Sequence, residues 1–176
     1  MIMKRFQWQD HFGSICDSPL EAMSPDNLPE RHPAGDFYRY WMGLNDGAMP
    51  SRSAFRPQAA ARNLRWMMVF DVNMDAPHVD FQLVLHGTSA TQLTHGNFTG
   101  QKLEQFTARD CYHSRYQAMV NSMYTGQPVF GRVSVGTHSE FRVDVLTGMF
   151  PFAADDGLAR LIMIGAPEEA MKRRFF

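Results

Sequence analysis

Apolar residues recur with helical spacing in two stretches of the chain. The first stretch places four large side chains at i, i+3, i+4 and i+7, on one helical face: Phe37, Tyr40, Trp41 and Leu44. It predicts a helix over residues 36–45. The second has its apolar residues at i, i+4, i+7 and i+11: Tyr112, Tyr116, Met119 and Met123. It predicts a helix over residues 108–124, ended by Gly126 and Pro128.

Elsewhere the apolar residues alternate with polar ones, which is typical of strands with one buried face. Two such strands, 64–73 and 79–86, lie between the helices, and three more follow the second helix, near 129–135, 141–149 and 158–164. This order predicts an α+β fold: a five-stranded antiparallel sheet with helices on one face, preceded by the 36–45 helix.

The two ends of the chain lack such a pattern. Residues 1–35 contain Pro19, Pro25, Pro29 and Pro33 and show no lasting period, which predicts an irregular N-terminal arm. Residues 36–166 form the predicted domain, and residues 167–176 a short basic and aromatic tail.

Charge and composition narrow the possible partners and the location. Lys and Arg total 17 and Asp and Glu total 18, a formal net charge of −1, so there is no strongly basic face of the kind that nucleic acids require. No apolar run approaches the length of a membrane span. The two cysteines, Cys16 and Cys111, make no disulfide framework, so we expect a cytoplasmic protein.

Four turn motifs occur in an order that is similar to a known family. They are Met49-Pro50-Ser51-Arg52, Leu85-His86-Gly87-Thr88, Gly96-Asn97-Phe98-Thr99-Gly100 and Thr125-Gly126-Gln127-Pro128. Together with the element order, they resemble the bacterial stand-alone PAS-like family, formerly a domain of unknown function, over residues 36–166. The resemblance implies a non-catalytic regulatory or sensory module, which binds a small ligand or a partner protein and signals through dimer contacts.

A ligand cavity in such a fold would lie between the sheet and the helices. We expect its lining among large apolar residues of those elements: Phe70, Phe81, Leu83, Phe106, Tyr116, Met119, Phe141 and Val143. The same residues could instead form an ordinary packed core. We expect the 36–45 helix face, Phe37, Tyr40, Trp41 and Leu44, to form a homodimer contact.

Other chemistries have weaker support. Haem is a possible cofactor, with His113 on the second helix as a weak candidate ligand, although the position used by haem-binding PAS sensors falls nearer Arg115 or Tyr116. The cysteine box of flavin photosensors is missing. No catalytic motif and no metal-ligand spacing occurs. The alternative is a small conical α+β enzyme of isomerase or dehydratase type, with Asp71, Asp80 or Asp144 as a base.

Overall fold

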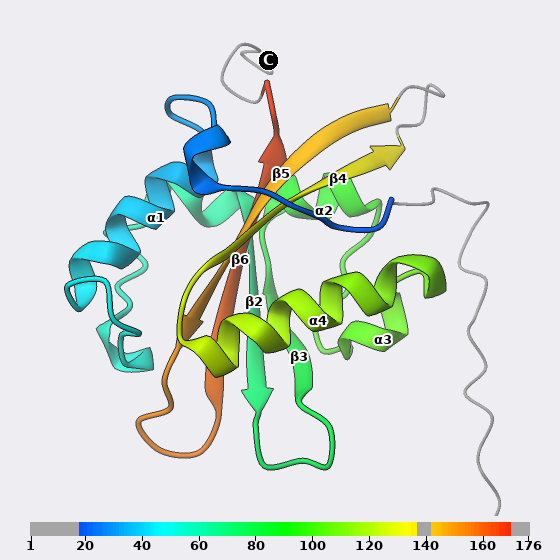
Figure 1. Ribbon diagram of the computed structural model, residues 1–176. Coiled ribbons are helices and arrows are strands. Elements are labelled where there is room, and N and C mark those ends of the chain that lie inside the picture. The colour runs from blue at the N-terminus through cyan, green and yellow to red at the C-terminus, as the bar shows by residue number, and fades with distance from the viewer. Residues whose placement is uncertain (1–17, 137–141, 170–176) are drawn as a thin grey trace, which may run out of the picture.

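The computed structural model describes residues 18–136 and 142–169 (Figure 1). The strands are β1 (Glu21–Ala22), β2 (Met67–Asn73), β3 (Asp80–His86), β4 (Val129–Gly136), β5 (Arg142–Phe152) and β6 (Ala159–Pro167). The α-helices are α1 (Pro33–Leu44), α2 (Thr88–Thr94), α3 (Leu103–Phe106) and α4 (Arg109–Thr125), and the 3-10 helices are η1 (Pro25–Asn27), η2 (Arg52–Ala54) and η3 (Ala61–Trp66). No helix among these residues is both long enough and apolar enough to cross a bilayer.

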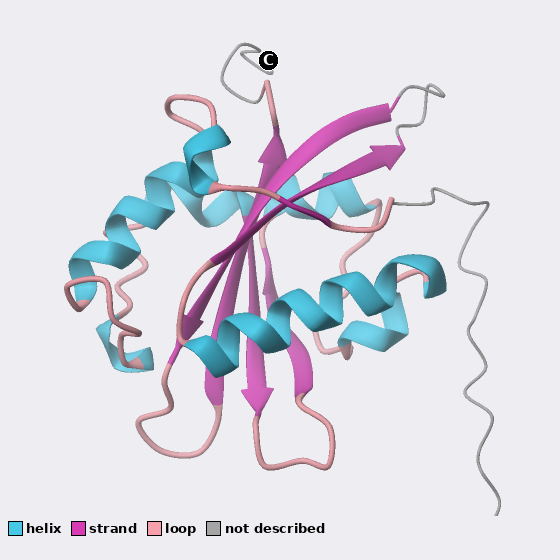
Figure 2. Cartoon of the chain, viewed as in Figure 1, coloured by secondary structure: helices cyan, strands magenta, loops and turns pink. Residues whose placement is uncertain are grey.

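The strands form one sheet in the order β1-β4-β5-β6-β2-β3, and every pairing is antiparallel. This confirms the predicted α+β fold with an antiparallel sheet (Figure 2). The five longer strands are those expected from the alternating pattern. The sixth, β1, is a two-residue strand contributed by the N-terminal arm.

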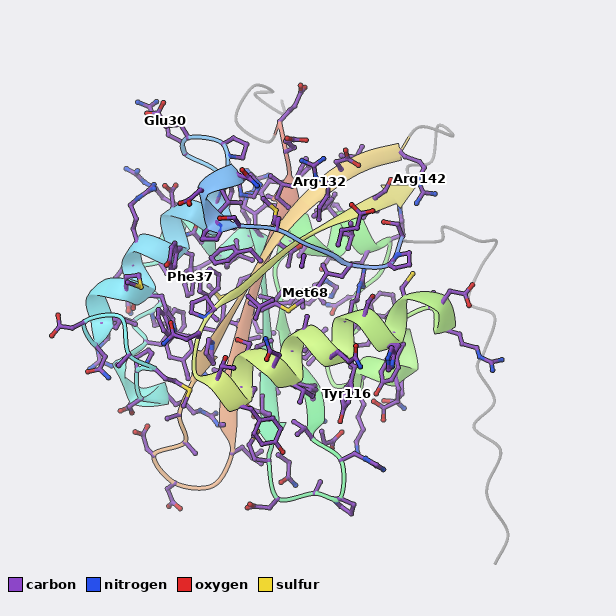
Figure 3. All side chains as sticks on the ribbon, in the orientation of Figure 1. Glu30, Phe37, Met68, Tyr116, Arg132 and Arg142 are labelled. Carbon is purple, nitrogen blue, oxygen red and sulfur yellow. The ribbon has the colours of Figure 1, made fainter. Side chains whose placement is uncertain are left out.

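The sheet is covered on both faces. Alternate residues of β5 belong to two different core clusters: Phe150 and Phe152 pack with α1, and Met149 packs with Met119 and Met123 of α4. Residues of α2 and α3 lie on the same sheet face as α4. In Figure 3, Phe37 lies on the inner side of α1, and Met68 lies near the middle of the molecule, above α4 in this view.

Helix α1 uses its aromatic face inside the chain. Phe37 and Trp41 are fully buried. Phe37 packs edge-on against Phe150, with ring centroids 4.8 Å apart, and Trp41 Nε1 donates to Pro151 O at 2.9 Å. These two side chains are therefore not available to a second copy, contrary to the predicted dimer contact. The second sheet face would otherwise be exposed to water, and α1 is the element that covers it.

The described part of the arm is ordered along β4. Ser18 N donates to Ser134 O and Met23 N to Phe130 O, both at 3.0 Å, and Leu20 N donates to Ser114 Oγ of α4 at 2.9 Å. Within the segment predicted to be irregular, the structure has two short elements, β1 and η1, and the first three residues of α1.

Helix α1 begins at Pro33, three residues earlier than predicted. A proline in the first helical position costs no hydrogen bond, because the first amide groups of a helix have no partner within the helix. His32 caps the helix: its Nδ1 accepts from Ala34 N at 3.1 Å. Helix α4 matches the predicted 108–124 to within a residue at each end.

Candidate functional site

A pocket lies between the sheet and the helices α2 and α4. We call it the inner pocket. Its floor is made by residues of β4, β5, β6 and β2: Val133, Val135, Val145, Thr147, Met149, Met163, Gly165 and Met68. Its walls come from α2, α4, the arm and η3: Ala90, Leu93, Thr94, Arg115, Leu20 and Trp66.

The inner pocket exists because its floor is built of short side chains. Gly165 has no side chain, and the valines and Thr147 are short enough to leave space beneath α2 and α4. The volume is about 60 Å³. A single water needs about 10–15 Å³, and a cavity that holds benzene measures about 150 Å³. The pocket therefore has room for a very small molecule as it stands.

The predicted lining forms a packed core beside the inner pocket. Phe70, Phe81, Leu83 and Met119 are fully buried there, and Phe106 and Tyr116 pack against them. Their rings are in contact, as in the edge-on pair Phe81–Tyr116 with centroids 5.9 Å apart. Large aromatic side chains fill the space that was expected to be empty.

None of the predicted lining residues that the structure describes borders the inner pocket. Val143 is half-buried on β5, opposite Val135. Phe141 lies outside the described residues. The predicted region, between the sheet and the helices, does contain a pocket, but the residues that line it are different ones.

Three polar side chains lie among the apolar residues of the inner pocket: Thr94, Arg115 and Thr147. Arg115 is the one charged residue among the lining positions described. Thr147 is 95% buried, since its exposed fraction is 5%. The hydroxyl of Thr94 lies 3.1 Å from Ala90 O, to which it donates, and 3.3 Å from His86 Nε2.

Sequence reasoning did not select Arg115 or Thr147, although each interrupts a pattern. Arg115 lies at i+4 from the buried Cys111 and at i−4 from the buried Met119. Thr147 lies on β5 between Val145 and Met149, on the same strand face. A charge within a buried helical stripe, and a hydroxyl within a buried strand face, are the features that could have identified them.

The weak haem candidate His113 is exposed on α4 and does not line the inner pocket. The buried Cys111 does not line it either. With a volume of about 60 Å³ and neither an imidazole nor a thiol at its wall, the pocket does not fit haem or a flavin adduct. Among the described residues, no group of three or more His, Cys, Asp or Glu side chains could hold a metal ion.

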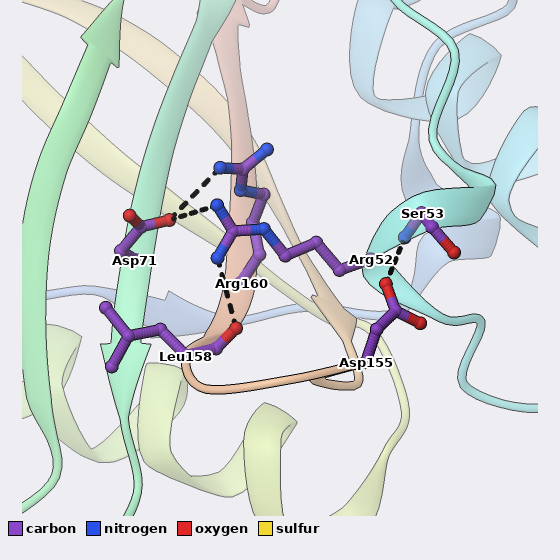
Figure 4. Close-up of polar contacts among 6 residues, drawn as sticks. All are labelled: Arg52, Ser53, Asp71, Asp155, Leu158 and Arg160. Atoms are coloured by element: carbon purple, nitrogen blue, oxygen red, sulfur yellow. Dashed lines mark hydrogen bonds and ion pairs between the residues drawn. The ribbon is translucent and has the colours of Figure 1, made fainter.

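The three candidate carboxylates lie in ion pairs away from the inner pocket. Asp71 contacts Arg52 at 3.3 Å and Arg160 at 3.1 Å, and Arg52 also donates to Leu158 O at 3.1 Å (Figure 4). Asp80 pairs with Lys102 at 2.9 Å. Asp144 pairs with Arg132 at 4.0 Å. None of these three carboxylates borders the inner pocket.

The ion pairs of Asp71 also explain the Pro50-Ser51-Arg52 motif. This segment pairs with the loop after β5, where Arg52 N donates to Ala153 O at 2.8 Å. Ser53 N donates to Asp155 Oδ2 at 2.9 Å, also shown in Figure 4. Hydrogen bonds to the Asp155 carboxylate, first from the Ser51 hydroxyl and then from Ser53, lower the pKa of Asp155. The motif therefore has a structural role: it anchors the segment between α1 and β2 to the β5–β6 connection.

No protein-family model matches the chain. No curated protein matches its sequence. Among solved structures, it is similar to a fungal LOV domain photoreceptor, with a TM-score of 0.39 and 15% identity over 66% of this chain and 94% of that one. It is also similar to an RNA-binding light-oxygen-voltage receptor, with a TM-score of 0.44 and 15% identity over 88% of this chain. The match spans 39% of that receptor. At this level of identity, the likeness is one of fold alone.

Proposed function

We propose that this chain is a non-catalytic sensory module of the PAS-like class, which binds a small ligand in the inner pocket and passes the change to a protein partner. The observation that carries the proposal is the pocket itself, enclosed by one sheet face, α2, α4 and the arm. A ligand in the inner pocket would contact several elements at once, so its binding would change how those elements pack on the sheet.

The lining suits a ligand that is mostly apolar. Valine and methionine side chains make up most of the floor, and three methionines, Met68, Met149 and Met163, come from three different strands. Methionine is unbranched and flexible, so it adapts to ligands of different shape. A rearrangement of these three side chains would enlarge the pocket without moving the backbone.

Methionine methyl NMR tests the proposal directly. The full chain, labelled with ¹³C at the methionine methyl groups, is titrated with three small probes: 1-butanol, butanamide and butanoate. We expect at least one probe to shift the signals of Met68, Met149 and Met163 with saturation, at a dissociation constant of about 0.1–10 mM. The signal of Met42, which is exposed on the outer side of α1, serves as the reference.

A pair of variants on α2 separates the pocket from the surface. Ala90→Leu adds three carbon atoms to the pocket wall and should abolish the saturable shifts. Ala90→Val is the milder form if the first unfolds. Gln92→Leu adds apolar bulk on the exposed side of the same helix and should leave binding unchanged. If none of the three probes moves the pocket methyl groups, the proposed function is wrong.

We also propose that the protein forms a homodimer. Because Phe37 and Trp41 are buried, the contact on α1 would use the half-buried Tyr40 and Leu44 and the exposed Met42. Aromatic and methionine side chains are enriched at such interfaces. Sedimentation velocity checks this, and a monomer across the whole accessible concentration range would contradict it.

A further inference from the structure

Three methionine side chains of the inner pocket stand directly opposite one another on adjacent strands. Met68 of β2 pairs with Met163 of β6, and Met163 pairs with Met149 of β5. All three line the floor of the inner pocket. Residues directly opposite each other in an antiparallel sheet have Cβ atoms about 4.5–5.5 Å apart. The floor therefore carries a continuous row of three thioether groups, which we call the methionine row.

The side chains of the methionine row can bring their sulfur atoms together at the pocket. Met68 and Met163 are half-buried although they lie on central strands, and Met149 is almost fully buried. Methionine is unbranched and turns about three single bonds. The two outer side chains can therefore direct their sulfur atoms toward that of Met163, at a place that a small ion reaches through the pocket.

The chemistry of the methionine row favours one class of ligand. Thioether sulfur is neutral and polarizable, and as a metal ligand it selects soft ions such as Cu(I). Mg²⁺ prefers oxygen ligands, and Zn²⁺ prefers thiolate, imidazole and carboxylate groups. Three thioethers on one sheet face are therefore a donor set for a soft monovalent cation. This set uses none of the His, Cys, Asp and Glu side chains that form most metal sites in proteins.

Two other residues beside the methionine row are not counted as ligands. His86 of β3 stands opposite Met68, but both of its ring nitrogens are engaged: Nδ1 accepts from Phe98 N at 3.3 Å, and Nε2 lies 3.3 Å from Thr94 Oγ1. Arg115, at the α4 wall, has an interaction partner of its own. It carries a charge of the same sign as a metal ion, but its side chain is half-buried, so solvent screens part of the repulsion.

We infer that the methionine row binds a soft monovalent metal ion of the Cu(I) class, through the Sδ atoms of Met68, Met149 and Met163. This inference goes beyond the proposed function. It requires the three sulfur atoms and the pocket in front of them, and it requires neither an organic ligand nor a protein partner.

Silver nitrate in chloride-free buffer tests the inference on the full chain, labelled with ¹³C at the methionine methyl groups. Ag⁺ has the charge and the softness of Cu(I) and needs no reductant. The thiols of Cys16 and Cys111 also bind soft ions, so the titration runs to about three equivalents of Ag⁺. We expect the signals of Met68, Met149 and Met163 to shift together along one saturation curve. Zn²⁺ at the same concentrations should leave them unchanged.

A pair of methionine variants separates the row from other methionines. Met163→Leu removes the central sulfur at nearly constant volume, and Met149→Leu is the alternative if it does not fold. Loss of a ligand should weaken Ag⁺ binding at the remaining methyl groups of the row by at least about 10-fold. Met74→Leu is the matched control. Met74 is also half-buried and packs against the same core cluster, but it does not line the pocket, so this variant should bind Ag⁺ as the wild type does.

The outcomes distinguish this inference from the proposed function. If Ag⁺ shifts only methionine signals outside the row, or if Met163→Leu binds as tightly as the wild type, the inference is overturned. An organic probe that binds in the pocket while Ag⁺ does not would overturn it and leave the proposed function standing. The opposite result, with Ag⁺ at the row and no organic probe in the pocket, would support the metal site and contradict the proposed function.

Discussion

His32 links the start of α1 to the end of β6 through both nitrogens of its imidazole ring. Nδ1 accepts a hydrogen bond from Ala34 N at 3.1 Å, and Nε2 lies 3.1 Å from Ala166 O. Because Nδ1 accepts, the ring proton must be on Nε2, which then donates to the carbonyl. The ring is neutral in this arrangement, and its burial lowers the pKa of His32 despite the nearby backbone carbonyls.

This arrangement makes stability depend on pH. The folded-state pKa of His32 lies below the unfolded value of about 6.5. The stabilisation is therefore complete above about pH 7 and is lost as the pH falls through the folded pKa, by at most about 1.4 kcal/mol per pH unit. Urea unfolding of the wild type and of His32→Asn, between pH 5 and 8, measures the difference.

Asparagine can still cap the helix but does not titrate in this range. The wild type should therefore lose its advantage over His32→Asn as the pH falls. His86, whose pKa burial also lowers, is present in both proteins and cancels from the difference. Parallel pH profiles for the two proteins would show that protonation of His32 does not govern the effect. At pH 7.5, His32→Ala should cost about 1–3 kcal/mol.

Single residues also show which features of the pocket could not be predicted from the sequence. The apolar stripe of α4 was predictable from spacing, but a spacing rule selects residues that fit the pattern. Arg115 and Thr147 were passed over because they break it. The predicted lining residues of β2, β3, α3 and α4 fit the pattern well, and for that reason they are the ones that pack. A pocket forms where side chains are short or polar, and its position depends on neighbours that only the fold brings together.

At the scale of elements, Gly87 governs how β3 leads into α2. A Cβ atom at this position would lie 2.3 Å from Leu64 O and 2.6 Å from Arg65 O of η3. Gly87 N also donates to Met67 O at 2.8 Å, which holds the backbone in place. The Gly-Thr sequence that ends β3 therefore reflects a close approach of two backbone segments, next to the α2 wall of the inner pocket.

Two glycine substitutions give opposite expected results. Gly87→Ala should destabilise the protein by about 1–3 kcal/mol, because backbone atoms cannot move away as a flexible side chain could. Gly43→Ala, within α1, meets no atom within 4 Å and should stabilise by about 0.5–1 kcal/mol through helix propensity. Chemical denaturation measures both. An equal response of the two variants would contradict the role assigned to Gly87.

The elements that sequence analysis missed are short or begin with proline. Strand β1 has two residues, too few for any alternation to be visible. The first turn of α1 was excluded because Pro33 was interpreted as a helix breaker, although proline is favourable at the first helical position. Longer elements such as α4 and β2 carry several repeats of their period, and the prediction located them well.

In the molecule as a whole, the sheet lies between two layers of helices, and its central strands pack against both layers. Residues 145–152 of β5 are all buried, which is typical of a strand covered on both faces. The alternating pattern identified one of these faces, with Val145 and Met149. The intervening Leu146, Phe150 and Phe152 indicate the second, which α1 covers. Contacts between residues far apart in sequence decide which helix covers each face of the sheet. The period of apolar residues within one segment contains no information on such contacts.

This two-layer arrangement predicts where a bound ligand acts. The sheet residues that line the inner pocket lie on the face covered by α2 and α4, and no described residue of α1 borders it. A saturating concentration of whichever probe binds the inner pocket should therefore slow hydrogen exchange of amides in α2 and α4 that open locally. Amides of α1 that open locally should exchange at an unchanged rate, because their contacts are to the opposite face.

Hydrogen exchange followed by mass spectrometry, with and without that probe, checks this prediction. Amides that exchange only through global unfolding are excluded from the comparison, because any ligand that binds the folded state protects them equally. Ala90→Leu serves as the control, since it fills the pocket and should lose the protection of α2 and α4. Protection confined to α1 would place the ligand on the opposite face of the sheet. Equal protection of all three helices would mean that the ligand stabilises the whole molecule as one cooperative unit. That result would contradict a response confined to the layer of α2 and α4.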